Sequence, residues 1–383
     1  SIRRRQRQMC IRDRSDFFLN NPNNTLDDNF TNKILKNSNS FFFHQSLKEY
    51  NKSSLVELSG LSKFLKISNL YIKDESTRFG LNAFKVLGAS YAVNQILIND
   101  PSVSVFCTAT DGNHGRALAW SAEKYNKKCV VFVPKSTSDL RIDAISKHGA
   151  TVKKLDLNYE NTCKYAFDIS KKMNWELVQD TSWNNYELIP AYIMSGYLTH
   201  LIEMENEINK LNKPNFDIVF LQCGVGSWAA SCIWYYLNRY KKNRPKIILV
   251  EPDESCGVFE SFKSGKRVSP RGSLNTIMAG LNCGIPSKSA WSIIKNGCDG
   301  VIKIVDNEVM SSMRLLYNPD KKDFQIISGE SGAAGLAGLI KCLNDKKAND
   351  LKKHIGLNQK SRILLFNTEG DTDRDSFIKI IKN

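Results

Sequence analysis

Lys85 is the first residue whose type and surroundings could do chemistry. It stands in the segment 78–88, RFGLNAFKVLG, among apolar neighbours at the expected start of a helix. Burial disfavours the charged form of a lysine, so we expect a lowered pKa and an amine that can act as a nucleophile. An exposed helix lysine is the alternative, and this segment alone does not exclude it.

Residues 108–115, TATDGNHG, form a second candidate site. They follow an apolar run and lead directly into a helix-like segment, so the first amides of that helix would face the loop. Backbone N–H groups and the helix dipole at such an end favour a carboxylate or a phosphate. A turn that only caps the helix is the alternative.

Residues 222–227, QCGVGS, form a third candidate site between an apolar run and a helix-like segment. The two glycines allow an anion to approach the backbone amides closely. Ala229 replaces the third glycine of a dinucleotide-binding motif, and the lysine of a P-loop is missing. A tight strand–helix turn is the alternative.

Two segments near the C-terminus complete the candidates. In the segment 367–373, NTEGDTD, Thr368 offers a hydroxyl group, whereas a polar surface turn is the alternative interpretation of Glu369 and Asp371. The small residues of 327–340, ISGESGAAGLAGLI, predict a helix-like stretch packed closely on a sheet. Its SGESG start could frame a cofactor ring from the side.

The elements that position these loops are predicted from apolar runs of strand length. Strands buried on both faces are expected at 103–109, 129–133, 217–222, 246–250 and 362–366. Helices are expected at 115–125, 140–148 and 227–240. This alternation predicts an α/β protein with right-handed crossovers. Ligands of parallel sheets collect at the carboxyl ends of the strands, where the candidate loops begin.

Charge and hydropathy argue against two classes of partner. The net charge is +15. Part of this positive charge comes from residues 1–14, which contain six arginines and a single aspartate. The remaining lysines are dispersed and not interleaved with aromatic residues, so we expect no nucleic-acid partner. No apolar run is long enough to cross a bilayer, which predicts a soluble protein without a membrane partner.

The cysteine and histidine patterns predict neither disulfides nor a metal site. The ten cysteines include no CxxC pair, and the five histidines show no paired spacing. Free thiols and a reducing, cytoplasmic location are therefore expected. Residues 1–39 differ from the rest in composition, and we expect a disordered or non-native N-terminal extension there.

Taken together, the segments resemble the diaminopropionate ammonia-lyase family of fold-type-II pyridoxal-phosphate (PLP) enzymes. The similarity runs from Tyr71 to Asp373 in the same order and with compatible spacing. It includes RFGLNAFKVLGASYA, TATDGNHGRALAW, ELVQDTSW, VEPD, TIMAGLNCG, IISGESGAAGL and NTEGDTD.

The resemblance implies a fold and an assembly. Two three-layer α/β domains with mainly parallel sheets are expected, with the cofactor in the cleft between them. Residues 40–80 and 201–383 would form a large domain and residues 81–200 a small one. Members of this family are usually homodimers, so a homodimer that binds a small amino acid is expected.

The resemblance also implies roles for the candidate residues. Lys85 would hold the aldehyde of PLP, Asn113 would meet the ring 3-hydroxyl, and Thr368 would meet the pyridine nitrogen. The cofactor phosphate would lie on the amides of Gly224, Val225, Gly226 and Ser227. The substrate carboxylate would lie against Thr110, Asp111, Gly112 and His114.

Asp111 and Asp180 are the implied bases for the α-proton. Two acids on opposite faces of the substrate would permit both D- and L-2,3-diaminopropionate. Loss of the β-amino group as ammonia would then release aminoacrylate, which hydrolyses to pyruvate and a second ammonia. A turn at a strand end is the alternative interpretation of Asp180.

Two other functions remain open from the sequence. One is a PLP-dependent serine/threonine dehydratase or β-lyase, and Asp111 argues against it because serine has no second ammonium group. The other is a catalytically inactive PLP-binding regulatory protein, and the presence of Lys85, Asp111 and Asp180 argues against that function.

Overall fold

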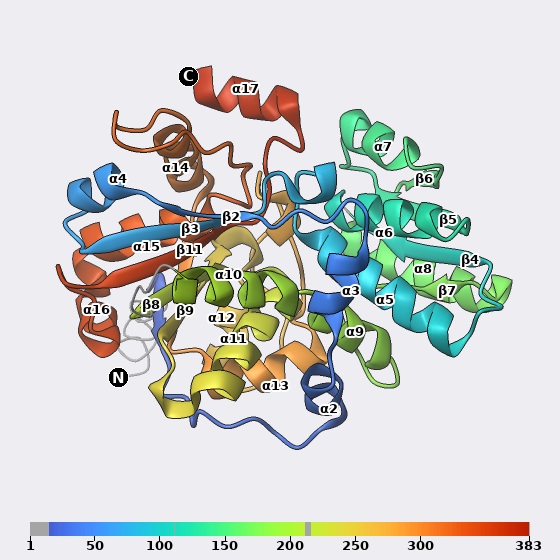
Figure 1. The fold of residues 1–383 in the computed structure, drawn as a ribbon, viewed down its shortest axis with the longest axis horizontal. Coiled ribbons are helices and arrows are strands. Elements are labelled where there is room, and N and C mark those ends of the chain that lie inside the picture. Colours follow the sequence, from blue (N-terminus) through green and yellow to red (C-terminus); the bar gives the residue numbers. More distant parts are fainter. Residues whose placement is uncertain (1–14, 111, 211–215, 383) are drawn as a thin grey trace, which may run out of the picture.

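Two β-sheets flanked by helices organise the chain (Figure 1). The computed structural model describes residues 15–110, 112–210 and 216–382. The arginine-rich segment 1–14 and Asp111 therefore lie outside the described residues. None of the helices in these ranges is both long enough and apolar enough to span a membrane.

The larger sheet has seven strands in the order β1-β10-β9-β8-β11-β3-β2. Its five inner strands are parallel, and the two edge strands β1 and β2 are antiparallel to their neighbours. The strands are β1 (Phe17–Leu19), β2 (Ser54–Glu57), β3 (Asn69–Asp74), β8 (Ile218–Gln222), β9 (Lys246–Pro252), β10 (Gly300–Ile304) and β11 (Arg362–Asn367).

Helices cover both faces of this sheet, because its central strands carry buried apolar side chains on both faces. In β8, Val219 and Leu221 pack in one core cluster, whereas Ile218 and Phe220 pack in the other. The first cluster includes α10 (Leu198–Lys210), α11 (Ser227–Tyr240), α12 (Gly257–Ser264) and α13 (Lys288–Gly297). The second includes α4 (Ser59–Phe64), α14 (Asp306–Tyr317), α15 (Ala334–Asn344), α16 (Asn349–Ile355) and α17 (Arg374–Lys382).

The smaller sheet has four parallel strands in the order β6-β5-β4-β7. They are β4 (Val105–Ala109), β5 (Lys128–Pro134), β6 (Thr151–Leu155) and β7 (Glu176–Leu177). The flanking helices are α5 (Lys85–Asn99), α6 (Asn113–Lys124), α7 (Asp139–Ser146), α8 (Tyr159–Met173) and α9 (Leu188–Gly196). The chain thus leaves the larger sheet after β3 and returns to it with β8.

Two glycines bring α5 and α9 into close contact and so fix the start of α5. A Cβ atom built at Gly196 would lie 2.2 Å from the carbonyl oxygen of Leu87. A Cβ atom at Gly88 would lie 2.6 Å from the ring of Tyr197. Neither helix could approach the other this closely with larger residues, and the first residue of α5 is Lys85.

The α/β fold class and the five strands expected from the sequence are confirmed, as is a helix that starts at Lys85. The expectation of disorder is wrong for the described part of residues 1–39. There β1 pairs with β10, and α2 (Phe30–Lys36), which is followed by α3 (Ser40–Ser46), contacts α9. The expected helical stretch 327–340 is also displaced, since α15 begins only at Ala334.

Candidate active site

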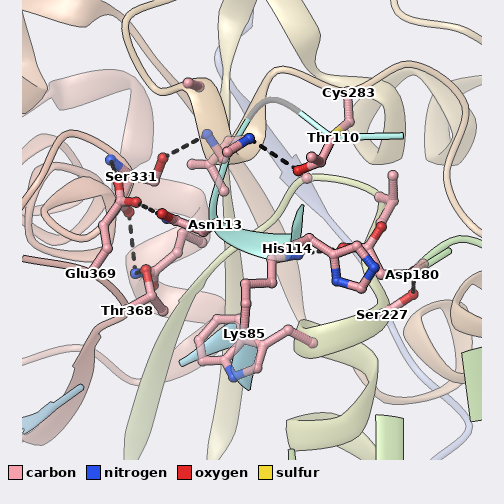
Figure 2. Close-up of a pocket in the computed structure, with 18 of the residues that line it drawn as sticks. Lys85, Thr110, Asn113, His114, Asp180, Ser227, Cys283, Ser331, Thr368 and Glu369 are labelled. Atoms are coloured by element: carbon pink, nitrogen blue, oxygen red, sulfur yellow. Dashed lines mark hydrogen bonds and ion pairs between the residues drawn. The ribbon is translucent and has the colours of Figure 1, made fainter. Parts of the chain in front are cut away.

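A single pocket collects the candidate residues at the carboxyl ends of β4, β8 and β11 (Figure 2). Every candidate residue that the structure describes lines it, namely Lys85, Thr110, Gly112, Asn113, His114, Asp180, Gly224, Val225, Gly226, Ser227 and Thr368. Asp111 lies outside the described residues. Loops far apart in the sequence therefore meet where parallel strands end.

Lys85 and Asp180 form the central ion pair of this pocket. The Lys85 Nζ atom lies 2.5 Å from Asp180 Oδ2, and both side chains are largely buried. Burial alone would lower the pKa of Lys85, but the neighbouring Asp180 carboxylate holds it above its ordinary value. The expected lowering of this pKa is therefore wrong, because the sequence did not reveal the carboxylate beside the amine.

Asp180 is held in its ionised form. Burial would raise the pKa of its carboxyl group, but the positive charge of Lys85 lowers it to about 2. The carboxylate is thus available as a proton acceptor at any pH near neutrality. Because Asp180 lines the pocket, its position favours a role in the site over the alternative interpretation of a simple strand-end turn.

His114 is a buried, neutral hydrogen-bond acceptor in the same pocket. Its Nε2 atom lies 2.8 Å from the carbonyl oxygen of Val178, and a carbonyl only accepts, so Nε2 carries the proton. Burial lowers the pKa of the imidazole. Within the described ranges no group donates to Nδ1, which leaves that buried nitrogen as an acceptor for a bound molecule.

The glycine loop after β8 offers an anion site. Among the described residues, none accepts a hydrogen bond from the backbone amides of Gly224, Val225 or Gly226. Gly226 has φ +93°, a conformation that favours glycine, and the loop leads directly into α11. The hydroxyl of Ser227 donates to the Asp180 carbonyl oxygen at 2.5 Å. These amides and the start of α11 suit a phosphate group.

The hydroxyl group of Thr368 accepts one hydrogen bond within the protein and can donate another into the pocket. Gln222 Nε2 donates to its Oγ1 atom at 3.0 Å, so the threonine hydroxyl retains its own hydrogen for another acceptor. Its backbone carbonyl accepts from the amide of Phe84 at 3.1 Å, which ties the end of β11 to the residue before Lys85. The side chain can therefore donate to a neutral ring nitrogen in the pocket.

Sequence reasoning missed several pocket residues. Glu369 lines the pocket and is only 3% exposed, so the alternative of a polar surface turn is wrong for it. Its place directly after Thr368 at a strand end was an available signal. Arg141, Tyr159 and Cys283 also line the pocket. Arg141 and Tyr159 lie in none of the motifs found in the sequence, whereas Cys283 lies in TIMAGLNCG, to which no role was assigned.

A buried ion network supports the segment that precedes Lys85. Arg78 contacts Glu75 Oε2 and Glu203 Oε2 at 2.7 Å each, and Lys73 contacts Glu203 Oε2 at 3.0 Å. All four side chains are at most 1% exposed. Burial alone would raise the pKa of Glu203, but Arg78 and Lys73 hold it below its ordinary value. The network joins β3 and α10.

His44, which supports the first turn of α5, is one residue that makes the stability of the fold depend on pH. Its Nε2 atom donates to the Leu87 carbonyl oxygen at 3.0 Å, and its Nδ1 atom lies 2.6 Å from Thr199 Oγ1. Burial, reinforced by the charge of Arg78, lowers the pKa of His44 from 6.5 to about 3. Between these values the unfolded chain binds a proton that the folded chain does not, so stability is lost as the pH falls.

We therefore expect the free energy of unfolding to fall by about 2 kcal/mol between pH 7 and pH 5 from His44 alone. Urea unfolding at both pH values measures the loss. A His44→Gln variant, whose amide can keep both hydrogen bonds, should show a loss smaller by that amount. An equal loss in the variant and the parent protein would contradict this assignment.

Comparisons with known proteins agree on one family. Residues 47–368 match the family described as "Pyridoxal-phosphate dependent enzyme". The chain is 38% identical to a diaminopropionate ammonia-lyase of Salmonella typhimurium, over 89% of this chain and 90% of that protein. It is 35% identical to a diaminopropionate ammonia-lyase of Escherichia coli, over 88% of this chain and 89% of that protein.

The fold agrees with the same family. A crystal structure of the Escherichia coli diaminopropionate ammonia-lyase, in complex with an aminoacrylate–PLP azomethine reaction intermediate, matches with a TM-score of 0.88 and 34% sequence identity. The match covers 95% of this chain and 96% of that chain.

Proposed function

The chain belongs to the diaminopropionate ammonia-lyase family of PLP-dependent enzymes, and from this premise we propose that it eliminates ammonia from D- and/or L-2,3-diaminopropionate. The products are pyruvate and ammonia. The observation that carries the proposal is the Lys85–Asp180 pair in the pocket that also holds the free amides of the glycine loop.

The pocket residues fit PLP. Lys85 would hold the cofactor aldehyde, Thr368 would donate to the pyridine nitrogen, and Asn113 would meet the 3-hydroxyl. The phosphate would accept hydrogen bonds from the amides of Gly224, Val225, Gly226 and Ser227. When bound, the cofactor supplies a ring that delocalises the electron pair left by removal of the α-proton.

The residues of the chain bind the substrate and move its proton. Thr110, Gly112 and His114 surround the start of α6, where backbone amides can receive the substrate carboxylate. Asp180, held ionised, takes the α-proton at a carboxylate oxygen. The electron pair left at the α-carbon then forms the double bond to the β-carbon. The bond to the β-nitrogen breaks at the same time, and because this nitrogen is an ammonium group, it leaves with the bonding pair as neutral ammonia. Water converts the released aminoacrylate to pyruvate and a second ammonia.

Asp111 is proposed as the second base, on the ground of its sequence position one residue before Gly112. The buried Nδ1 acceptor of His114 supports recognition of a substrate ammonium group on this side of the pocket. A substrate with two amino groups suits acidic and accepting side chains better than serine or threonine does.

The direct test measures 2-oxo acid release by the purified, PLP-loaded protein. We expect rapid release from D- or L-2,3-diaminopropionate, or from both, and at most slow release from L-serine and L-threonine. Release from serine or threonine alone would contradict the ammonia-lyase function and favour a dehydratase. A protein that binds PLP but releases nothing from any of them would favour a regulatory role.

Three further features are proposed with this function. Residues 40–80 and 201–383 would form the large domain and 81–200 the small one, which the membership of the two sheets supports. Two copies would form a homodimer, and the protein would act in the cytoplasm. The buried free cysteines among the described residues are compatible with that compartment.

A further inference from the structure

Glu369 is a buried carboxylate for which the proposed reaction has no use. It follows β11, is 3% exposed and lines the pocket. Its Oε2 atom accepts a hydrogen bond from Asn113 Nδ2, and its Oε1 atom accepts one from the Ser331 amide at 2.9 Å. Figure 2 shows the Asn113 and Glu369 side chains pointing toward one another.

The backbone around Glu369 is fixed from two sides. Its carbonyl oxygen accepts from the Gly329 amide at 3.0 Å, and the residue forms an antiparallel bridge with Ala83. Ala83 lies two residues before Lys85, so the carboxylate is held in register with the lysine that would carry the cofactor. Within the described ranges no cation forms an ion pair with Glu369. Among these residues, the polar contacts of its side chain are the hydrogen bonds from Asn113 and Ser331.

The contact with Asn113 determines which way the asparagine amide faces. An ionised carboxylate only accepts hydrogen bonds, whereas a side-chain amide presents a carbonyl oxygen on one side and two N–H groups on the other. If the amide of Asn113 were flipped, two acceptors would face each other in a buried site, which is unfavourable. Glu369 thus selects the orientation in which Nδ2 lies toward it, and one N–H of that group remains for another acceptor.

We propose that Glu369 is a positioning residue that orients Asn113 so that its second N–H is donated to the 3-hydroxyl oxygen of PLP. This inference rests on the proposed role of Asn113 in the cofactor site. A hydrogen bond donated to an oxygen favours its ionised form, so Glu369 acts through Asn113 on the ionisation of the cofactor oxygen. Glu369 itself does not touch the reacting atoms.

The test compares Glu369→Gln with Asn113→Ala and with the double variant. Glutamine keeps the shape of Glu369, but it has only one acceptor oxygen. That oxygen can accept from Asn113 or from Ser331, and the N–H₂ group of the glutamine then faces the other donor. We expect E369Q to shift the ratio of the two absorption bands of bound PLP toward the neutral hydroxyl form. We also expect PLP affinity to fall about tenfold, as for the loss of one hydrogen bond. In the N113A background, E369Q should have no further effect on either quantity.

A neighbouring acid provides the matched control. Glu330 is also 3% exposed, but of the SGESG segment Ser331 lines the pocket and Glu330 does not. Glu330 accepts from Ser376 Oγ at 2.5 Å rather than from Asn113. Glu330→Gln should leave the absorption ratio of bound PLP unchanged. An unchanged spectrum and affinity in E369Q, with both altered in N113A, would overturn the role of Glu369 alone. Unchanged values in N113A as well would overturn the proposed role of Asn113.

A compensating pair separates positioning from simple packing. Asn113→Asp alone places two carboxylates together, whereas N113D/E369Q restores one donor and one acceptor between the two positions. We expect this double variant to recover the unfolding midpoint lost in N113D but to keep an altered PLP spectrum, since no N–H from position 113 reaches the cofactor. Recovery of the parent spectrum would overturn the proposal, even if E369Q alone folds poorly.

Discussion

Replacing Asp180 with asparagine is expected to lower the turnover of at least one enantiomer of 2,3-diaminopropionate by about 10²- to 10⁴-fold. Asparagine fills the same space and can still contact Lys85 Nζ, which lies 2.5 Å from Asp180 Oδ2. It cannot accept a proton from carbon. Burial also dominates the environment of Lys85 once the carboxylate is gone, so the pKa of Lys85 should fall.

The measurement is the kcat of the PLP-loaded variant for each enantiomer, which is determined from the rate of pyruvate release. Asp139→Asn is the control, because that carboxylate is exposed on the first turn of α7. Its kcat should equal that of the parent protein. If Asp111 removes the α-proton from the opposite face of the substrate, the D111N variant should show reduced turnover of the other enantiomer. Near-normal turnover of both enantiomers in D180N and in D111N would contradict the assignment of either acid as a base.

Replacing Arg78 with alanine is expected to destabilise the fold by about 3–5 kcal/mol. Arg78 is 1% exposed and donates to Glu75 at 2.7 and 2.9 Å and to Glu203 at 2.7 and 2.9 Å. Its removal leaves two buried carboxylates with Lys73 as the remaining cation of the network. Uncompensated buried charge, rather than the lost attraction itself, accounts for most of this effect.

Urea unfolding of the PLP-loaded proteins measures this loss. Arg239→Ala is the matched control, since Arg239 pairs with Glu205 at 2.9 Å but its side chain is 57% exposed. Solvent screens that pair, and its removal should change the free energy of unfolding by at most ~1 kcal/mol. Equal losses in R78A and R239A would show that burial does not determine the strength of these ion pairs.

The elements of the fold were largely predictable because each depends on neighbouring residues. The runs at 217–222 and 362–366 are apolar at successive positions, which is typical of strands covered on both faces. The helix that starts at Lys85 was predicted from its local pattern in the same way. The segment 17–36 was not predictable, because the short strand β1 is stabilised by pairing with β10, nearly three hundred positions away.

The sequence by itself determined which residues could take part in the chemistry: an amine at Lys85, acids at Asp111 and Asp180, and a loop of amides around Gly226. Their residue types and their places at strand ends are local properties. Only the tertiary structure decided the protonation of Lys85 and Asp180 and the orientation of Asn113. Lys85 meets Asp180 across 95 positions, and Asn113 meets Glu369 across 256. A pKa depends on the charges and burial around a group, and these arise only when distant segments pack together.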